Sequence, residues 1–239
     1  MIDNRVCPYC GQILTRVENA DNCRSVEHLI PHVALTRKRT NEEGDFYACR
    51  QCNCRKSHID YVLGMIVKAQ SPHDELAANT LRAAVLKEDG RARRFIDMVR
   101  TARKGSDGIE MEMPIKGSEL VEYLNYMGKG EFFKRHKIPY DPNRHVMEIQ
   151  LINKQVLGPL EKTHFDRHGS NPFRELALNS RSEVINEGEC VIFSKSNEFL
   201  FIFHHYTAVI VRVMRKTEEN TAKAVQSEQY VLEHFTYAP

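Results

Sequence analysis

The spacing of apolar residues divides the chain into regions of different predicted secondary structure. Between residues 74 and 104, apolar side chains recur three and four positions apart, which is typical of amphipathic helices. Two groups of residues carry this repeat: Leu81, Ala84 and Val85, and then Phe95, Val99 and Ala102. Asp89 and Gly90 interrupt the pattern, so we predict two helices or one broken helix here.

The second half of the chain has short apolar runs that predict β-strands. Short polar turns separate three of them, ECVIFS (189–194), EFLFIFHH (198–205) and AVIVRVMR (208–215). Before these runs, Ser118 is the predicted N-cap of a helix that begins SELVEYLNYM. We therefore predict a small α+β domain with an antiparallel sheet over residues 106–239.

A change of pattern near residue 62 and a candidate linker divide the chain further. The linker is KGSDG, residues 104–108, whose glycines and polar residues favour a loop. The predicted parts are residues 1–62, a basic helical segment over residues 63–105, and the C-terminal domain. His204 and His205 end an apolar run without a companion pattern of metal ligands, so we expect a structural or sheet-edge role for them.

Composition and charge are those of an ordinary globular protein, with 28% charged and 41% hydrophobic residues among 239. No stretch approaches the roughly 20 apolar residues of a transmembrane helix, and no secretory signal pattern is present, so we expect a cytoplasmic protein without membrane contact. The net charge of +2 says little about nucleic acid. Basic residues outnumber acidic ones most clearly between Arg82 and Lys104, where they could extend a nucleic-acid track or face a protein partner.

The cysteines lie almost entirely at the start of the chain. Two pairs, Cys7/Cys10 and Cys49/Cys52, have the two-residue gap that lets two thiolates reach one tetrahedral zinc at about 2.3 Å. A reducing cytosol favours metal over disulfides for such pairs. Four thiolates close the coordination sphere, so we predict a structural zinc that replaces a core which some sixty residues can hardly build alone. Cys23 and Cys54 fall outside the pattern and are predicted as non-ligands.

Three motifs between residues 5 and 60 resemble the zinc-ribbon branch of the HNH (ββα-metal) nucleases. They are Cys7-x-x-Cys10, Glu27-His28-x-x-Pro31 and Cys49-x-x-Cys52-Asn53-x-x-Lys56, in the order typical of that family. The resemblance implies a β-hairpin that carries the acidic-His pair and a helix that begins at the second cysteine pair. It also implies that residues 1–62 form an HNH module.

The resemblance further implies roles for individual residues. Glu27 and Asn53 would hold a divalent cation through oxygen, and such ligands suit magnesium or manganese better than zinc. His28 would be the general base that takes a proton from water, because histidine titrates near neutral pH. The expected reaction is hydrolysis of a phosphodiester bond.

Three positions around this motif have more than one interpretation. His58 lies about one helical turn after Asn53 and would join the metal, contact a phosphate or simply be exposed. His32 is predicted as a loop residue beside the base, with a metal-ligand role as the alternative. The middle Asn of the family motif has no clear counterpart, because Asn41 lies too far upstream and Asp45 has a different side chain.

Basic residues near the second and third motifs are the predicted nucleic-acid contacts: Arg37, Lys38, Arg39, Arg50, Arg55 and Lys56. The segment TRKRTNEEG, which ends at Gly44, is expected to be an exposed finger. No phosphate-binding glycine loop, HExxH or GxSxG motif occurs.

Two classes of function follow. The first is a metal-dependent endonuclease, with double-stranded DNA as the expected substrate. Its layout is similar to that of phage-encoded, restriction or antiphage-defence nucleases. Its C-terminal domain would bind the target, a regulatory protein or a second copy of the chain. The second class is a zinc-stabilised nucleic-acid-binding or scaffold protein with a degenerate site.

Overall fold

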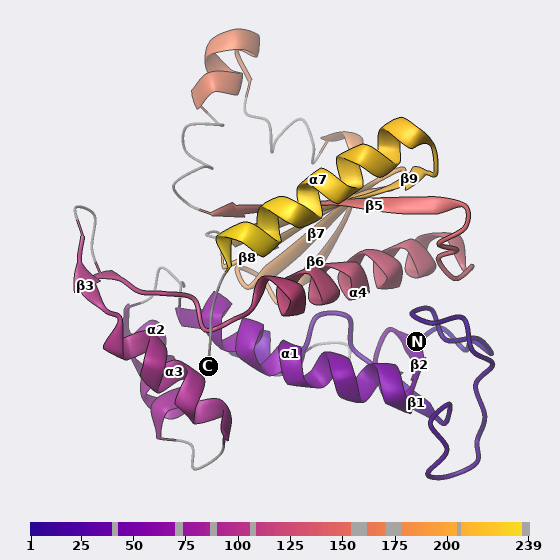
Figure 1. Ribbon diagram of the computed structural model, residues 1–239, viewed down its shortest axis with the longest axis horizontal. Helices are drawn as coiled ribbons and strands as arrows, with labels where there is room; N and C mark the ends of the chain where they lie inside the picture. Colours follow the sequence, from indigo (N-terminus) through magenta and orange to yellow (C-terminus); the bar gives the residue numbers. More distant parts are fainter. Residues whose placement is uncertain are drawn as a thin grey trace.

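A five-stranded antiparallel sheet forms the C-terminal half of an α+β fold (Figure 1). The computed structural model describes residues 1–39, 43–69, 74–86, 90–105, 109–153, 162–170, 178–204 and 207–235. The strand order is β5-β9-β8-β7-β6. The strands are β5 (His145–Asn153), β6 (Arg181–Ile185), β7 (Cys190–Lys195), β8 (Glu198–Phe203) and β9 (Thr207–Arg215). The predicted antiparallel sheet is confirmed, and β5 and β6 extend it at its two edges.

The N-terminal region is a β-hairpin followed directly by a helix. β1 (Arg24–Glu27) pairs antiparallel with β2 (Phe46–Cys49), and α1 (Arg50–Ala69) begins at the next residue. A 3-10 turn, η1 (His32–Ala34), lies in the connection between the two strands. A Cβ atom added to Gly64 of α1 would lie 2.8 Å from the Ala34 nitrogen, so glycine lets the helix approach this turn closely.

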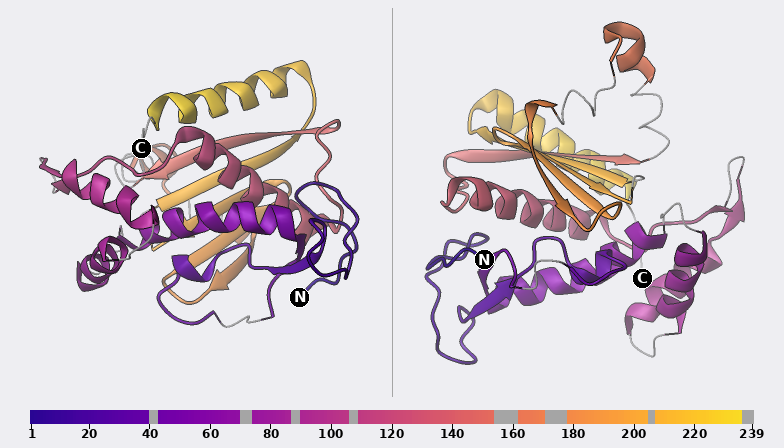
Figure 2. Two further views of the ribbon diagram at one scale, coloured as in Figure 1. Left: turned by 60° about the horizontal axis from the view of Figure 1, so that its bottom comes forward. Right: turned by 180° about the vertical axis from the view of Figure 1, so that it is seen from behind.

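Helix α4 (Gly117–His136) lies between α1 and the sheet, as two views show (Figures 1 and 2). Its contact with the N-terminal region is close, because a Cβ atom at Gly130 would lie 2.4 Å from Leu29 Cδ1. Helix α7 (Glu218–His234) runs along β5 and α4, and the Thr217 side chain accepts a hydrogen bond of 3.2 Å from the Asn220 N–H at its start.

Within the basic segment, residues 74–100 contain two helices, α2 (Asp74–Val85) and α3 (Gly90–Arg100), as predicted, and Asp89 of the predicted break lies outside the described residues. A short hairpin of β3 (Arg103–Lys104) and β4 (Ile109–Glu110) follows them. Most of the predicted linker, residues 106–108, lies outside the described residues. These elements project from one side of the molecule (Figure 1).

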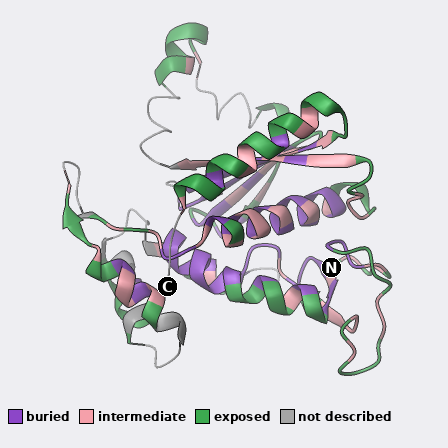
Figure 3. Cartoon of the chain, viewed as in Figure 1, coloured by how far each residue is buried: buried purple, intermediate pink, exposed green. Residues whose placement is uncertain are grey.

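One apolar cluster runs from the N-terminal region through α4 into the sheet, and Leu29, Ile66, Leu124 and Val211 all belong to it. The second half of α1, residues 59–67, is buried at every position (Figure 3). This core crosses both boundaries of the predicted three-part division, which stays a prediction.

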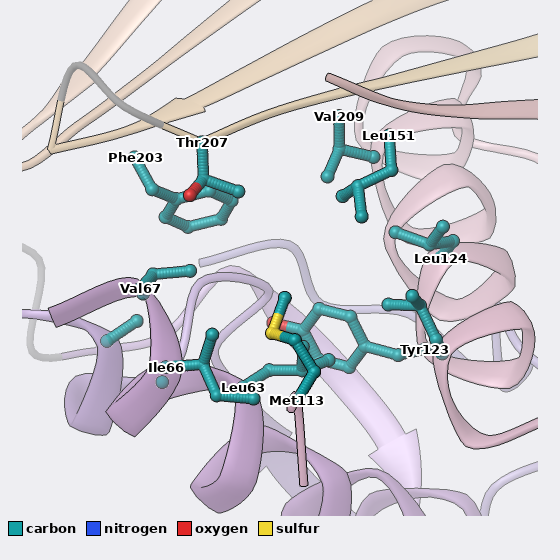
Figure 4. A pocket seen from close by; sticks show the side chains of 13 residues that line it. Leu63, Ile66, Val67, Met113, Tyr123, Leu124, Leu151, Phe203, Thr207 and Val209 are labelled. Carbon is teal, nitrogen blue, oxygen red and sulfur yellow. The ribbon is translucent and has the colours of Figure 1, made fainter. Parts of the chain in front are cut away.

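An apolar cavity of about 30 Å³ remains where α1, α4 and the sheet meet. Figure 4 shows Leu63 and Val67 of α1 across this space from Phe203 and Val209 of the sheet. A cavity of this size has room for about two water molecules, and apolar cavities stay dry. It is a gap in the packing between the layers.

Two local predictions are wrong. Helix α4 begins at Gly117 with Lys116 as its N-cap, because the Glu119 carboxylate accepts a hydrogen bond of 3.1 Å from the Lys116 N–H and closes the first turn ahead of Ser118. The predicted exposed finger also folds back in part. Its residues 40–42 lie outside the described residues, but Arg39 is buried.

Candidate functional site

Four cysteines from the two predicted pairs meet at one point. The Sγ atoms of Cys7, Cys10, Cys49 and Cys52 all lie within 4.8 Å of one another. Sulfur atoms around a tetrahedral zinc are separated by about 3.8 Å, because each lies about 2.3 Å from the metal. The Sγ atoms of Cys10 and Cys49 are 3.7 Å apart. The cluster could therefore hold a structural zinc ion, as predicted.

The backbone around the cluster supports sulfur as a ligand. The Cys49 N–H donates to Cys7 Sγ at 3.3 Å, and the Cys52 N–H donates to Cys49 Sγ at 3.4 Å. A hydrogen bond from the Cys52 thiol lowers the pKa of Cys7 to about 5, whereas burial raises the pKa of Cys49 to about 11. Only part of the set ionises readily without a cation, because thiolates this close repel one another. Cys23 and Cys54 are outside the cluster.

Glu27 lies at the end of β1 in a buried cluster of charges. Its side chain is 2% exposed, and its Oε1 atom lies 3.0 Å from the Nζ atom of Lys56 on α1. The same Nζ atom contacts both carboxylate oxygens of Asp60, at 2.8 and 2.9 Å. Lys56 therefore joins the hairpin to the helix. With both carboxylates ionised, two negative charges surround one positive charge, so the cluster carries excess negative charge.

Burial is the largest influence on the pKa of each group in this cluster. Burial raises the pKa of Glu27 and of Asp60, and the ammonium of Lys56 offsets only part of that increase. Burial alone would lower the pKa of Lys56, but the two carboxylates outweigh it and raise that pKa. Burial and the same negative charges raise the pKa of Tyr9 and of Tyr123 well above the ordinary value, so both phenols stay protonated.

Asn53 reaches from the first turn of α1 back to β1. Its Nδ2 atom donates to Ser25 Oγ at 2.7 Å and to the carbonyl oxygen of Val26 at 3.0 Å. A carbonyl oxygen only accepts, so the amide must present its nitrogen to the strand and turn its Oδ1 atom away. None of the described residues donates a hydrogen bond to this Oδ1 atom. Asn53 thus contacts Val26, the residue immediately before Glu27.

The histidines of the motif lie in different surroundings. His28 is half-buried, and its ring centroid lies 4.6 Å from that of the exposed His32. His58 is exposed on α1. It follows Asn53 by five residues, which places the two side chains about 140° apart around a helix of 3.6 residues per turn. The described contacts thus bring Asn53, but not His58, to the end of β1.

Asp45 and Arg39 hold the chain just after His28, a role that the sequence pattern did not indicate. The Asp45 carboxylate accepts the Leu29 N–H at 2.9 Å and pairs with Arg39 through two contacts of 2.9 Å. Arg39 also donates to the carbonyl oxygen of Ile30 at 3.0 Å. Both side chains are almost fully buried. The segment after His28 is therefore fixed through its backbone.

The predicted phosphate-binding residues divide into exposed and buried members. Arg37, Lys38, Arg50 and Arg55 are exposed. Arg37 lies 3.3 Å from Glu189, and Arg55 lies 3.2 Å from Glu122. Lys56 and Arg39 were predicted to contact nucleic acid, and this prediction is wrong. Both are buried in the ion pairs described above, where no surface ligand reaches them.

A third group of polar residues joins the N-terminal region to the sheet. Glu189 accepts hydrogen bonds from the Thr36 N–H at 3.1 Å, from the Thr36 hydroxyl and from Asn186 at 3.1 Å. The buried His204 ring lies 2.9 Å from the Ala34 carbonyl oxygen, which fits the predicted structural role. His205 lies outside the described residues.

No protein-family model, curated protein or solved structure matches the chain. None of the helices among the described residues combines the length and apolar composition needed to span a bilayer.

Proposed function

We propose that this protein is a metal-dependent endonuclease of the HNH type that hydrolyses phosphodiester bonds, with double-stranded DNA as the first substrate to test. The observation that carries the proposal is the orientation of Asn53. Its amide nitrogen is fixed on β1, which leaves a carboxamide oxygen free beside the strand that ends at Glu27. An amide oxygen and a carboxylate form a ligand set suited to magnesium or manganese.

A divalent cation bound there would stabilise the negative charge that builds on the phosphate during hydrolysis. His28 follows Glu27 directly and is only half-buried, so part of this residue is accessible to solvent. In the proposed reaction His28 accepts a proton from a water molecule, and the resulting hydroxide attacks phosphorus as the bond to the leaving oxygen breaks.

In this proposal, Asp45 and Arg39 are positioning residues that hold the chain next to His28. A general base contributes most when its distance to the reacting water is constrained. Asp45 holds the Leu29 N–H and Arg39 holds the Ile30 carbonyl, so the two residues after His28 are both anchored. This backbone support replaces the side-chain support that the middle Asn gives in the family motif.

The test is single-turnover cleavage of plasmid DNA with magnesium or manganese by the wild type and by His28→Ala at matched DNA occupancy. General bases contribute typically about a hundredfold to ten-thousandfold, so we expect at least a hundredfold loss of rate with unchanged zinc content. His168→Ala, in the separate helical residues 162–168, is the matched control and should cleave normally. Equal rates for wild type and His28→Ala would overturn the assignment.

A second candidate function is favoured by the closed contact between Glu27 and Lys56. The carboxylate is almost inaccessible and already has a cation beside it. In a zinc-stabilised nucleic-acid-binding or scaffold protein, this ion pair would serve only to hold the hairpin on α1. Retained zinc and DNA binding, with no cleavage at any magnesium or manganese concentration, would support this function over the nuclease.

A further inference from the structure

A polar hollow of about 120 Å³ lies at the C-terminal end of α4, and none of Glu27, His28 and Asn53 lines it. Charged side chains from α4, from the residue after it and from the edge strand β6 line it: Glu131, Lys134, Arg135, Lys137, Arg181 and Glu183. No role in the proposed function uses them.

The pairing of β6 with β7 creates one wall of the hollow. Arg181 and Glu183 are two residues apart in β6, so both point to the same face of the sheet. Arg181 is opposite Ser194 in the register, and Ser194 donates a hydrogen bond of 3.0 Å to Glu131 of α4. The helix end is thus fixed against this edge of the sheet.

The two carboxylates of the hollow share one ammonium group. The Lys134 Nζ atom lies 2.6 Å from Glu183 and 3.3 Å from Glu131. Burial would lower the pKa of Lys134, but the neighbouring carboxylates, Asp45 included, outweigh it and raise that pKa, so the amine stays charged. Both carboxylates of the hollow therefore already have this ammonium group beside them.

Three further cations remain without such partners. The side chains of Arg135, Lys137 and Arg181 are exposed, and none makes a hydrogen bond or ion pair with a described residue. Four cations therefore line the hollow against two carboxylates. The C-terminal end of α4 adds a partial negative charge of roughly half a unit, which is too small to remove this positive excess.

We propose that the hollow binds a phosphate group. Arginine presents several N–H donors in a planar fork that matches the oxygens of phosphate, and Lys137 adds a compact positive charge. This inference does not depend on the proposed nuclease activity. The phosphate could belong to a free phosphorylated compound or to a nucleic-acid backbone, and one experiment separates the two sources.

The experiment measures binding of inorganic phosphate to the full-length protein by isothermal titration calorimetry, with chloride at equal ionic strength as the reference. We expect wild-type binding with a dissociation constant of about 1 mM or tighter, and a loss of roughly tenfold for each of Arg135→Gln and Arg181→Gln. Arg167→Gln is the matched control, because Arg167 is exposed in the helical residues 162–168 and does not line the hollow. Wild-type affinity in both hollow variants, or no phosphate binding by the wild type, would overturn the proposal.

A second titration with a short DNA duplex identifies the source. If the site takes a backbone phosphate, the Arg181→Gln variant should also bind the duplex more weakly and with a shallower salt dependence. If it takes a free compound, duplex affinity stays at the wild-type value while phosphate binding is lost. Both outcomes support a phosphate site and are independent of whether the protein cleaves DNA.

Discussion

The N-terminal region and the C-terminal sheet are held together in different ways. The described part of residues 1–69 buries five charged side chains, which are Glu27, Arg39, Asp45, Lys56 and Asp60. It also brings four cysteines to one point: Cys7, Cys10, Cys49 and Cys52. The sheet is held mainly by apolar side chains such as Phe199, Phe201 and Val211, which are completely buried. The first region depends on a few specific contacts, and the second spreads its stability over many interchangeable ones.

This difference has a physical origin in how much apolar volume each region encloses by itself. A short hairpin with one helix encloses little apolar volume, so specific polar and metal contacts must offset the entropy lost on folding. Such contacts fail as a unit, because removing one partner leaves the other buried without compensation. Single substitutions should therefore have larger effects in the N-terminal region than in the sheet.

The largest expected effect is that of Cys49→Ser. Binding of structural zinc contributes about 10–16 kcal/mol in small zinc domains, so losing one ligand should unfold the N-terminal region. Zinc content should fall, and amide exchange over residues 1–60 should become fast while the sheet stays protected. Cys54→Ser is the control, since Cys54 is exposed and lies outside the cluster. Normal zinc content and protection in Cys49→Ser would remove the contrast between the two regions.

The next largest effect is expected for Lys56→Met, at about 3–5 kcal/mol of unfolding free energy. The substitution leaves Glu27 and Asp60 buried without a cation. Their pKa values, already raised by burial, should rise further, and a carboxyl with a raised folded pKa destabilises the fold when it is ionised. The loss of unfolding free energy relative to the wild type should be largest at neutral pH and should shrink as the pH falls toward about 4.

Chemical denaturation at several pH values measures this deficit. Lys195→Met provides the control, because Lys195 is exposed and has no ion pair among the described contacts. A loss in Lys56→Met that does not vary with pH would mean that packing of the lysine stem, rather than its charge, holds the hairpin on α1.

Sequence predicted the parts of the molecule that local spacing encodes. A Cys-x-x-Cys pair fixes two ligands within one turn, and runs such as EFLFIFHH identify strands, so the cysteine cluster and β7, β8 and β9 were predictable. Helix α7 was missed, because only Ala224 and Val231 are buried along its 17 residues and no apolar stripe results.

Burial of charge was the main part that sequence did not reveal. Lys56 and Arg39 were predicted at the surface, and both are in the interior. The spacing of Lys56 and Asp60, four residues apart in a helix, was a signal for their ion pair. Arg39 and Asp45 lie on either side of residues 40–42 in the connection between β1 and β2, and no periodic pattern relates two such positions. The orientation of Asn53 likewise depends on a contact between distant segments.

Glu189 lies between the two regions. We expect Glu189→Gln to lower the free energy of unfolding by about 2 kcal/mol at pH 7, which is less than for Lys56→Met. Burial would raise the pKa of Glu189, but hydrogen bonds from Thr36 and Asn186 outweigh it and hold that pKa below the ordinary value. A carboxyl with a lowered folded pKa stabilises the fold above its unfolded pKa of about 4.3. This contribution is lost as the pH falls through the folded pKa.

Wild type and Glu189→Gln should therefore differ at neutral pH and converge in acid. Urea unfolding at pH 7 and below pH 4 tests this, with the exposed Glu187→Gln as the matched control. A difference that persists in acid would show that Glu189 contributes through shape rather than through its charge.

The smallest loss of stability, about 1 kcal/mol, is expected for Ile192→Val in β7, an inner strand of the sheet. Ile192 is completely buried in β7 and is opposite Phe201 in β8. Removing one methyl group loses its burial and leaves a small gap, but valine keeps the branched shape that suits a strand. Ile138→Val makes the same chemical change at a residue that is 55% exposed, and it should leave stability unchanged. The two variants are compared by thermal unfolding. If Ile192→Val costs as much as Lys56→Met, the sheet also depends on individual contacts, and its stability is not distributed.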